Sequence, residues 1–140
     1  MVTLPSSICG VNPSPRNQAI VSSRAPRPLG PYPHARRLGN LLFLSGIGPR
    51  HGETEKVPEG IEAQTRSCIE NVKAILEDAG SSLEKVVDVT VFLTNIDRDF
   101  AAFNRVYGQY FETIRPTRTT VGVVALPVPI SIELKIIAES

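Results

Sequence analysis

The chain has 140 residues, 41% of them hydrophobic, and a mean hydropathy near zero, which suits one domain with an ordinary apolar core. Fifteen basic and fourteen acidic residues give a net charge of +1 without long runs of one sign, so we expect no nucleic-acid partner. No stretch approaches the roughly 20 apolar residues of a membrane helix, and residues 1–10 lack the basic and apolar regions of a signal peptide. We therefore expect a cytoplasmic protein that does not bind membranes.

The two cysteines, Cys9 and Cys68, are far apart in the sequence. They are too few for a disulfide framework, and no third cysteine or histidine pair accompanies them as zinc ligands. We interpret both as free thiols, with Cys68 on the apolar stripe of a helix, and we expect neither a metal nor a cofactor.

The first 23 residues are expected to form an extended segment rich in proline and serine, followed by a single domain over residues 24–140. Seven of the twelve prolines fall between Pro5 and Pro33, which disfavours regular structure there. Within this segment, only residues 17–23 could form a short strand. An irregular loop then leads to a strand near residues 35–38, a turn at Gly39 and Asn40, and an apolar strand over residues 41–46.

Two amphipathic helices are predicted in the middle of the chain. Apolar residues recur every three or four positions from Glu59 to Ala79, and Gly80 is a natural C-terminal stop. A buried strand is predicted over residues 85–96. The second helix is predicted over residues 100–111, with Asp97 or Asp99 as its N-cap.

Two strands are predicted near the C-terminus, over residues 117–126 and 129–137. The first is dense in β-branched residues, and the second alternates apolar and polar residues with a period of two. Pro127 and Pro129 mark a bend between them. Glu133 should therefore point away from the core, and we expect the two strands to be adjacent and to bring Arg118 and Glu133 to one edge.

The order of these elements predicts an α+β fold in which a β-sheet carries both helices on one face. The chain has no third predicted helix for the opposite face. Self-association through that face is the expected way to cover it.

Four separated motifs occur in the order and spacing of a known family. They are GPY at residues 30–32, LFLSG at 42–46, DFAAFNRVYGQYF at 99–111, and RPTRTTV at 115–121 followed by the Glu133 segment IELKIIA. On these motifs, residues 24–138 resemble the RidA family (also called YjgF/YER057c/UK114), the reactive imine and enamine deaminases. The segments PRPLGPYPHARR and SGIGPR are most similar to its 2-aminomuconate deaminase branch.

The resemblance implies a chorismate-mutase-like fold with a mixed sheet, assembled as a homotrimer around a central barrel with three clefts between subunits. Whether trimers pair into hexamers stays open. The resemblance also implies hydrolytic deamination of an enamine or imine carboxylic acid without a metal or cofactor. The most specific hypothesis is conversion of 2-aminomuconate to 4-oxalocrotonate (2-oxohex-3-enedioate) and ammonia, in aromatic-compound or tryptophan catabolism.

Arg118 and Glu133 are the predicted catalytic residues. The planar guanidinium of Arg118 suits two-point binding of a carboxylate, and Glu133 matches the family position that orients a water. The other predicted substrate-binding residues are Tyr32, Ser45, Gly46, Asn104, Thr120 and Arg50. Structural roles are the alternative for this set. Arg118 could form a surface ion pair, and Glu133 could be a solvated residue of its strand. The others could pack, form a turn or lie on a helix surface.

Thr120 stands where many family members carry a cysteine, which argues against thiol chemistry at that position. Basic residues flank two of the motifs and could meet a second carboxylate, although most are expected to be solvated loop residues. They are His34, Arg36, Arg37, Arg50 and His51. Arg36 and Arg37 should face opposite sides of their strand, so at most one of them can reach the cleft.

Two other functions stay open on sequence grounds. The nearest enzyme alternative is a general 2-iminoacid deaminase, acting on 2-iminobutanoate or 2-iminopropanoate. The alternative of another class is a non-catalytic trimer that binds small carboxylates or other proteins. Ribonuclease activity has also been assigned within the family.

Overall fold

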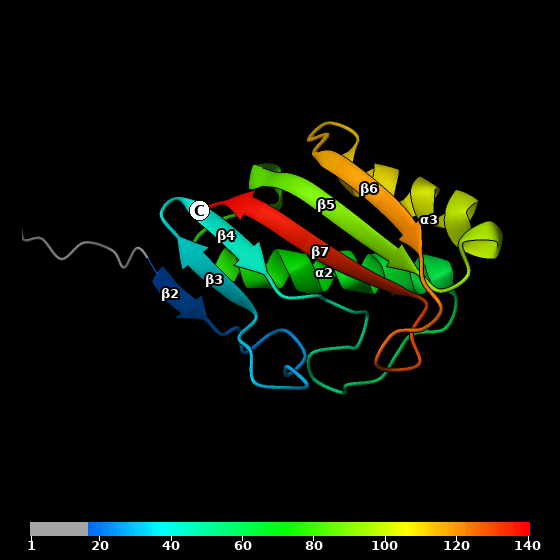
Figure 1. Cartoon of the computed structure of the whole chain (residues 1–140), viewed down its shortest axis with the longest axis horizontal. Coiled ribbons are helices and arrows are strands. Elements are labelled where there is room, and N and C mark those ends of the chain that lie inside the picture. Colours follow the sequence, from blue (N-terminus) through cyan, green and yellow to red (C-terminus); the bar gives the residue numbers. More distant parts are fainter. Residues whose placement is uncertain (1–16) are drawn as a thin grey trace, which may run out of the picture.

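A computed structural model describes residues 17–140, so the part of the expected extended segment before Asn17 lies outside the described residues. The described chain forms one six-stranded mixed sheet with two α-helices on one of its faces (Figure 1). The α+β prediction is confirmed. None of the helices in this part of the chain is both long and apolar enough to cross a membrane.

The first three strands form an antiparallel series at one side of the sheet. β2 (Asn17–Ile20), β3 (Ala35–Leu38) and β4 (Leu41–Leu44) pair in that order. The turn between β3 and β4 uses Gly39, whose φ of 61° is easily adopted by glycine. Because β2 pairs with β3 along its whole length, the sheet begins before residue 24.

The strand order is β2-β3-β4-β7-β5-β6, so the last two strands of the sequence are not neighbours. β5 (Val86–Leu93) and β6 (Thr117–Gly122) run parallel, and α3 (Ile96–Phe111) connects them, because a parallel pair requires a crossover. β7 (Ile132–Glu139) lies between β4 and β5 and is antiparallel to both. The predicted adjacency of the last two strands is wrong, because β5 separates them.

The core lies between the sheet and α2 (Ile61–Asp78), which ends before Gly80 as predicted, with Gly80 at φ 84°. A short 3₁₀ helix, η1 (Leu83–Lys85), leads from α2 into β5. Alternate strand residues face α2, and the fully buried side chains include Leu42, Leu44, Ile69, Val72, Ile75, Leu76, Val89, Leu93, Ile132, Leu134 and Ile136. Alternation with a period of two therefore gives the sheet one core face.

The second helix begins at Ile96 rather than near residue 100, and the predicted N-cap is wrong. Asn95 is the N-cap: its φ of −143° is not helical, and its Oδ1 accepts the Arg98 N–H at 3.1 Å. Asp97 and Asp99 lie in the first turn, where negative charge is favourable near the helix N-terminus.

The other face of the sheet carries no helix in residues 17–140 (Figure 1). Its side chains include Phe43, which is aligned with Ile137, and Phe92, which is aligned with Val121. All four are at least partly exposed. Such a row of apolar side chains is consistent with association through this face, which stays a prediction.

Candidate functional site

The predicted site residues form two groups on opposite faces of the sheet. Arg118 of β6 is aligned with Val89 of β5, which is aligned with Ile136 of β7, and both of these are buried beneath the helices. Glu133 is aligned with Phe92 on the uncovered face. Arg118 and Glu133 therefore do not meet within one copy, and the prediction that neighbouring strands bring them to one edge is wrong.

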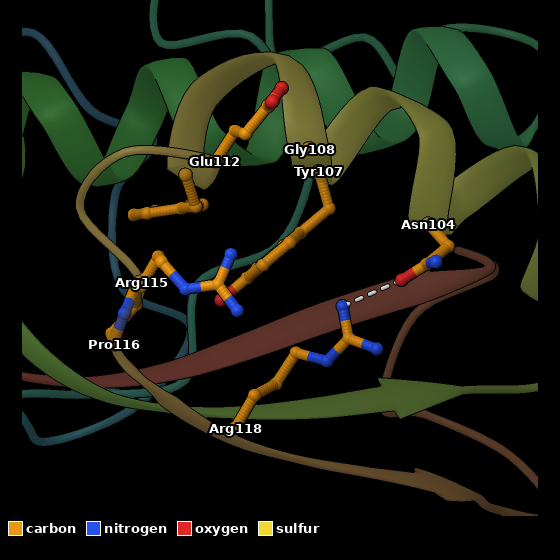
Figure 2. Close-up of a pocket in the computed structure, with 8 residues that line it drawn as sticks. Asn104, Tyr107, Gly108, Glu112, Arg115, Pro116 and Arg118 are labelled. Atoms are coloured by element: carbon orange, nitrogen blue, oxygen red, sulfur yellow. Dashed lines mark hydrogen bonds between the residues drawn. The ribbon is translucent and has the colours of Figure 1, made fainter.

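Arg118 lies in a pocket of about 500 Å³ between α3 and the start of β6, which we call the arginine pocket (Figure 2). Part of the lining comes from one side of α3 and part from the segment that enters β6. The lining residues are Asn104, Tyr107, Gly108, Phe111, Glu112, Arg115, Pro116 and Arg118. The crossover from β5 to β6 therefore builds this pocket.

The guanidinium of Arg118 is held by one hydrogen bond and by aromatic rings. Its Nη1 donates to Asn104 Oδ1 at 2.8 Å, as drawn in Figure 2. Its central carbon lies 4.7 Å from the ring centroid of Tyr107, 5.2 Å from that of Phe103 and 5.9 Å from that of Phe100. Rings at these distances stabilise a cation. A guanidinium has five N–H donors, so the bond to Asn104 leaves a pair of donors for a carboxylate.

Tyr107 and Arg115 are pocket residues that the sequence analysis missed. The Tyr107 hydroxyl is buried and has no hydrogen-bond partner among the described residues. Its burial raises the pKa of Tyr107 to about 12, so the hydroxyl stays protonated and can donate at neutral pH. The spacing of Asn104 and Tyr107, three residues apart on one helix, is the sequence signal that could have placed both on the pocket side.

Glu133 lies in a second pocket, of about 180 Å³, which we call the glutamate pocket. The loop before β3, the segment after β4 and the loop before β7 supply its walls. The lining residues are Leu29, Tyr32, Gly46, Gly48, Pro49, Arg50, Pro127, Val128, Ile130 and Glu133. Tyr32, Gly46, Arg50 and Glu133 are thus brought together, whereas Arg118 and Asn104, which were predicted for the same site, line the arginine pocket.

Gly46 lies directly against the Glu133 carboxylate. A Cβ at residue 46 would be 2.2 Å from Glu133 Oε2 and 2.9 Å from Cδ, so a larger residue forces the carboxylate to move. Burial raises the pKa of the Glu133 carboxyl. A carboxylate with a raised pKa is a stronger proton acceptor than an exposed one.

Buried His34 fixes the loop that carries Tyr32. Its Nδ1 accepts the Ser22 N–H at 3.0 Å, so Nε2 carries the proton and donates to the Pro26 carbonyl at 2.7 Å. The expectation that His34 is a solvated loop residue is wrong: only 3% of its surface is exposed. Its two hydrogen bonds leave it no free nitrogen for a substrate.

Tyr32 and Ser45 meet at the inner end of the same loop. Both line a small cavity that adjoins the glutamate pocket and shares Tyr32, Gly46 and Gly48 with it. The Ser45 hydroxyl donates to the Pro33 carbonyl at 2.7 Å, and the Tyr32 hydroxyl accepts the Leu29 N–H at 3.3 Å. Ser45 therefore holds the loop, while 45% of Tyr32 is exposed and available to a ligand.

Arg50 is the predicted basic residue that lines the glutamate pocket. Its side chain is 15% exposed, pairs with Glu55 at 3.2 Å and donates to the Arg27 carbonyl at 2.8 Å. Arg36 and Arg37 face opposite sides of β3, as predicted. Arg37 donates to the carbonyl of Ala79 beyond the end of α2, and Arg36 donates to Asn17.

Comparison with known proteins places the chain in a family. Residues 22–140 match the family described as Endoribonuclease L-PSP. The chain belongs to the RidA family. A RutC family protein of Pyrococcus abyssi is 45% identical over 122 residues, which are 86% of this chain and 95% of the relative.

Two further RidA-family matches come from Escherichia coli. A protein of strain K12 with the provisional name reactive intermediate deaminase TdcF is 39% identical over 122 residues, covering 85% of this chain and 94% of the relative. The crystal structure of E. coli TdcF with bound serine has a TM-score of 0.83 and 38% identity, and the match covers 88% of this chain and 98% of that one.

Thr120 and Cys68 are two further residues of this RidA-family chain whose roles were predicted from the sequence. Thr120 follows Arg118 on the same side of β6, outside the arginine pocket, and its Oγ1 is buried without a partner among the described residues. Cys68 is a buried free thiol that donates to the Ile47 carbonyl at 2.9 Å, and burial raises its pKa, which confirms a packing role. Within residues 17–140, His, Cys, Asp and Glu side chains form no group of three that could hold a metal ion. Cys9 lies outside the described residues.

Proposed function

We propose that this protein hydrolyses enamine and imine carboxylic acids to 2-oxo acids and ammonia, in the cytoplasm, and that 2-aminomuconate is its specific substrate. The observation that carries the proposal is the pair of half-sites: a guanidinium with free donors in one pocket and a carboxylate of raised pKa in another. Membership of the RidA family and similarity to the E. coli protein named as a deaminase support the general reaction.

The two half-sites are proposed to combine between the subunits of a homotrimer. β6 is an edge strand of the sheet, and the face that carries Glu133 is uncovered, so a second copy can approach both. Each cleft then contains Arg118 and Asn104 of one subunit and Glu133, Tyr32 and Gly46 of its neighbour. Pairing of trimers into hexamers is left to experiment.

The proposed reaction needs positioning and one proton acceptor. Arg118 holds the carboxylate next to the C=N carbon, and an enamine first tautomerises to the imine. A water near Glu133 gives a proton to the carboxylate while its oxygen bonds to the imine carbon, and the protonated Glu133 passes that proton to the nitrogen. In the resulting carbinolamine, Glu133 accepts the hydroxyl proton and transfers it to the amine, so that the C–N bond breaks, ammonia leaves and the C=O bond forms. One water is consumed, and no electrons are exchanged with an external partner.

The second enzyme candidate is a general deaminase of 2-iminobutanoate and 2-iminopropanoate. It uses the same residues and differs only in needing no second anion site. Its distinguishing property is equal or better use of the monocarboxylate than of the dicarboxylate. The substrate comparison described below therefore decides between the two.

The alternative of another class is a trimer that binds small carboxylates without turnover. The E. coli TdcF structure with bound serine is compatible with carboxylate binding in that relative. Cleavage of RNA, which the family description names, is less compatible with the near-neutral charge of this chain. Both rivals predict that ammonia release in the presence of the protein does not exceed the spontaneous rate.

The test is ammonia release from 2-aminomuconate and from 2-iminopropanoate by the purified protein, compared with spontaneous hydrolysis. We expect acceleration of both reactions and faster use of 2-aminomuconate. Glu133→Gln is expected to abolish the acceleration while the variant still binds the product acid. No acceleration by the unmodified protein, or full activity of Glu133→Gln, would overturn the proposal.

A further inference from the structure

We propose that Arg115 and Tyr107 form a second anion subsite in the arginine pocket, so that this pocket selects substrates with two carboxylates. The proposal rests on the proposed function, because it takes Arg118 as the anchor of the first carboxylate. It assigns the distal carboxylate to a residue that the sequence analysis did not consider for this role.

Arg115 and Arg118 project into the same space. Both line the arginine pocket together with Tyr107, and Figure 2 shows both guanidinium groups directed into it. Three residues of chain span at most about 11 Å, and each arginine side chain is long and flexible. Two carboxylates separated by a short carbon chain can therefore be held at the same time.

The charge of the pocket favours an anion. Neither Arg115 nor Arg118 has an ion-pair partner in the described part of the chain, and Glu112 is the single acidic residue in the lining. Other arginines do have such partners: Arg24, Arg27, Arg50, Arg98 and Arg105. The arginine pocket thus has two free cations and one carboxylate, an excess of positive charge.

Tyr107 supplies an independent observation in favour of a binding site. Tyr107 lines the pocket and is 8% exposed, and its buried hydroxyl has no partner among residues 17–140. Buried hydroxyls normally form hydrogen bonds, because leaving one unsatisfied is unfavourable. A carboxylate bound by Arg115 would accept this hydrogen bond.

The backbone of Arg115 also points to a role outside folding. Its φ of 54° is in the left-handed region, which is unfavourable for a residue with a Cβ and is readily adopted by glycine. The Arg115 N–H donates to the Phe111 carbonyl at 2.9 Å, which closes the turn after α3, and Pro116 follows. A glycine would form this turn with less strain, so the arginine side chain is not needed for it.

The basic residues expected from the sequence are less suitable for the distal carboxylate. Arg50 is neutralised by Glu55 and also donates to the Arg27 carbonyl. Arg37 faces the helices and donates to the Ala79 carbonyl, whereas Arg36 donates to Asn17 at the far strand of the sheet. Arg115 is exposed and free of such partners in the described chain.

The test compares a monocarboxylate with a dicarboxylate substrate. We would measure kcat/KM on 2-iminopropanoate and on 2-iminopentanedioate for the unmodified protein, Arg115→Gly and Arg115→Gln. Both variants are expected to lose at least about 10-fold on the dicarboxylate, as for a lost charge-assisted hydrogen bond, and less than about twofold on the monocarboxylate. Tyr107→Phe is expected to show a smaller loss with the same selectivity.

Arg66→Gln is the matched control, because it removes the charge of an exposed arginine that hydrogen-bonds Gln109 outside the arginine pocket. It should leave both rates unchanged. Arg115→Gly should melt at the same or a higher temperature, since glycine relieves the left-handed residue. Equal losses on both substrates, or no loss on the dicarboxylate, overturn the subsite.

Equilibrium binding separates this proposal from the proposed function. Calorimetry with hexanedioate and with butanoate needs no turnover. The subsite predicts that Arg115→Gly weakens hexanedioate binding about 10-fold and leaves butanoate binding unchanged. If the protein hydrolyses no imine but shows this pattern, the proposed function fails and the subsite stands; if Arg115→Gly binds both acids like the unmodified protein, the subsite fails.

Discussion

The arginine pocket and the glutamate pocket are built on the same sheet, but they hold groups of opposite charge in different surroundings. The arginine pocket lies at an edge strand, where α3 places aromatic rings and an amide around a guanidinium. The glutamate pocket lies on a central strand, where loops enclose a carboxylate against a glycine. Because the cation and the carboxylate are on opposite faces, they do not neutralise each other within one copy, and each stays free for a ligand.

Under the proposed function, this separation links activity to assembly. A single copy would offer the Arg118 anchor on one face and the Glu133 proton acceptor on the other. If neighbouring copies complete the site, dissociation must abolish turnover even when each copy stays folded.

Glu133→Gln is expected to have the largest effect. It keeps the shape of the glutamate pocket but removes the proton acceptor, so kcat should fall by about 10²–10⁴-fold. Binding of a product acid should stay within about twofold, because Arg118 provides the anchor. A stopped-flow or coupled ammonia assay measures the first quantity and calorimetry the second; a simultaneous loss of binding would place the anchor in the glutamate pocket.

Arg118→Lys is expected to be next in size. Lysine keeps the charge but lacks the planar pair of donors, so we expect a loss of at least about 2 kcal/mol in transition-state binding, or roughly 30-fold in kcat/KM. Light scattering should show an unchanged assembly. Near-normal turnover would mean that the carboxylate is held elsewhere.

Gly46→Ala is a smaller change to the glutamate pocket. The added methyl would overlap the end of the flexible Glu133 side chain, so the carboxylate moves and the fold is retained. We expect about a 10-fold loss of kcat, as for a misplaced catalytic group, with stability within about 1 kcal/mol. Chemical denaturation measures the stability. A large destabilisation would show that the Glu133 carboxylate cannot move away from the added methyl group.

Mixing the two impaired variants tests whether the pockets combine between copies. Arg118→Lys and Glu133→Gln subunits, unfolded together and refolded at equal amounts, should form hybrid trimers in which about one cleft in four has both wild-type residues. Activity should rise to roughly a quarter of the unmodified level. No recovery, or a folded species near the monomer mass of 15.2 kDa by light scattering, would contradict an intersubunit site.

The pH profile gives the smallest effect. Burial raises the pKa of Glu133, so the carboxylate becomes protonated, and loses its role as acceptor, at a higher pH than an ordinary glutamate near about 4.3. The acid limb of kcat/KM should therefore lie above that value and fall as pH decreases. In Glu133→Gln this limb should be absent; a limb that persists belongs to another group.

The sequence by itself determined much of the local structure. Periodicity predicted α2, its stop at Gly80, the buried strand β5 and the outward direction of Glu133, because these follow from patterns of neighbouring residues. The motif likeness placed Tyr32, Gly46, Arg50 and Glu133 in one predicted site with Arg118 and Asn104, and the structure divides that set between two pockets. The cap at Asn95 was missed because nearby aspartates offered an equally good local pattern.

Only the tertiary structure decided how distant segments meet. β7 pairs between β4 and β5, and nothing local in β6 or β7 encodes that insertion, since strand order depends on long-range packing. The same ordering separates Arg118 from Glu133 and places Arg115 and Tyr107 in the lining of one pocket. His34 is likewise buried and hydrogen-bonded to Ser22 and Pro26, which precede it by 12 and 8 residues in the chain. Local pattern therefore fixed which residues carry the chemistry, and packing fixed which of them can act on one ligand.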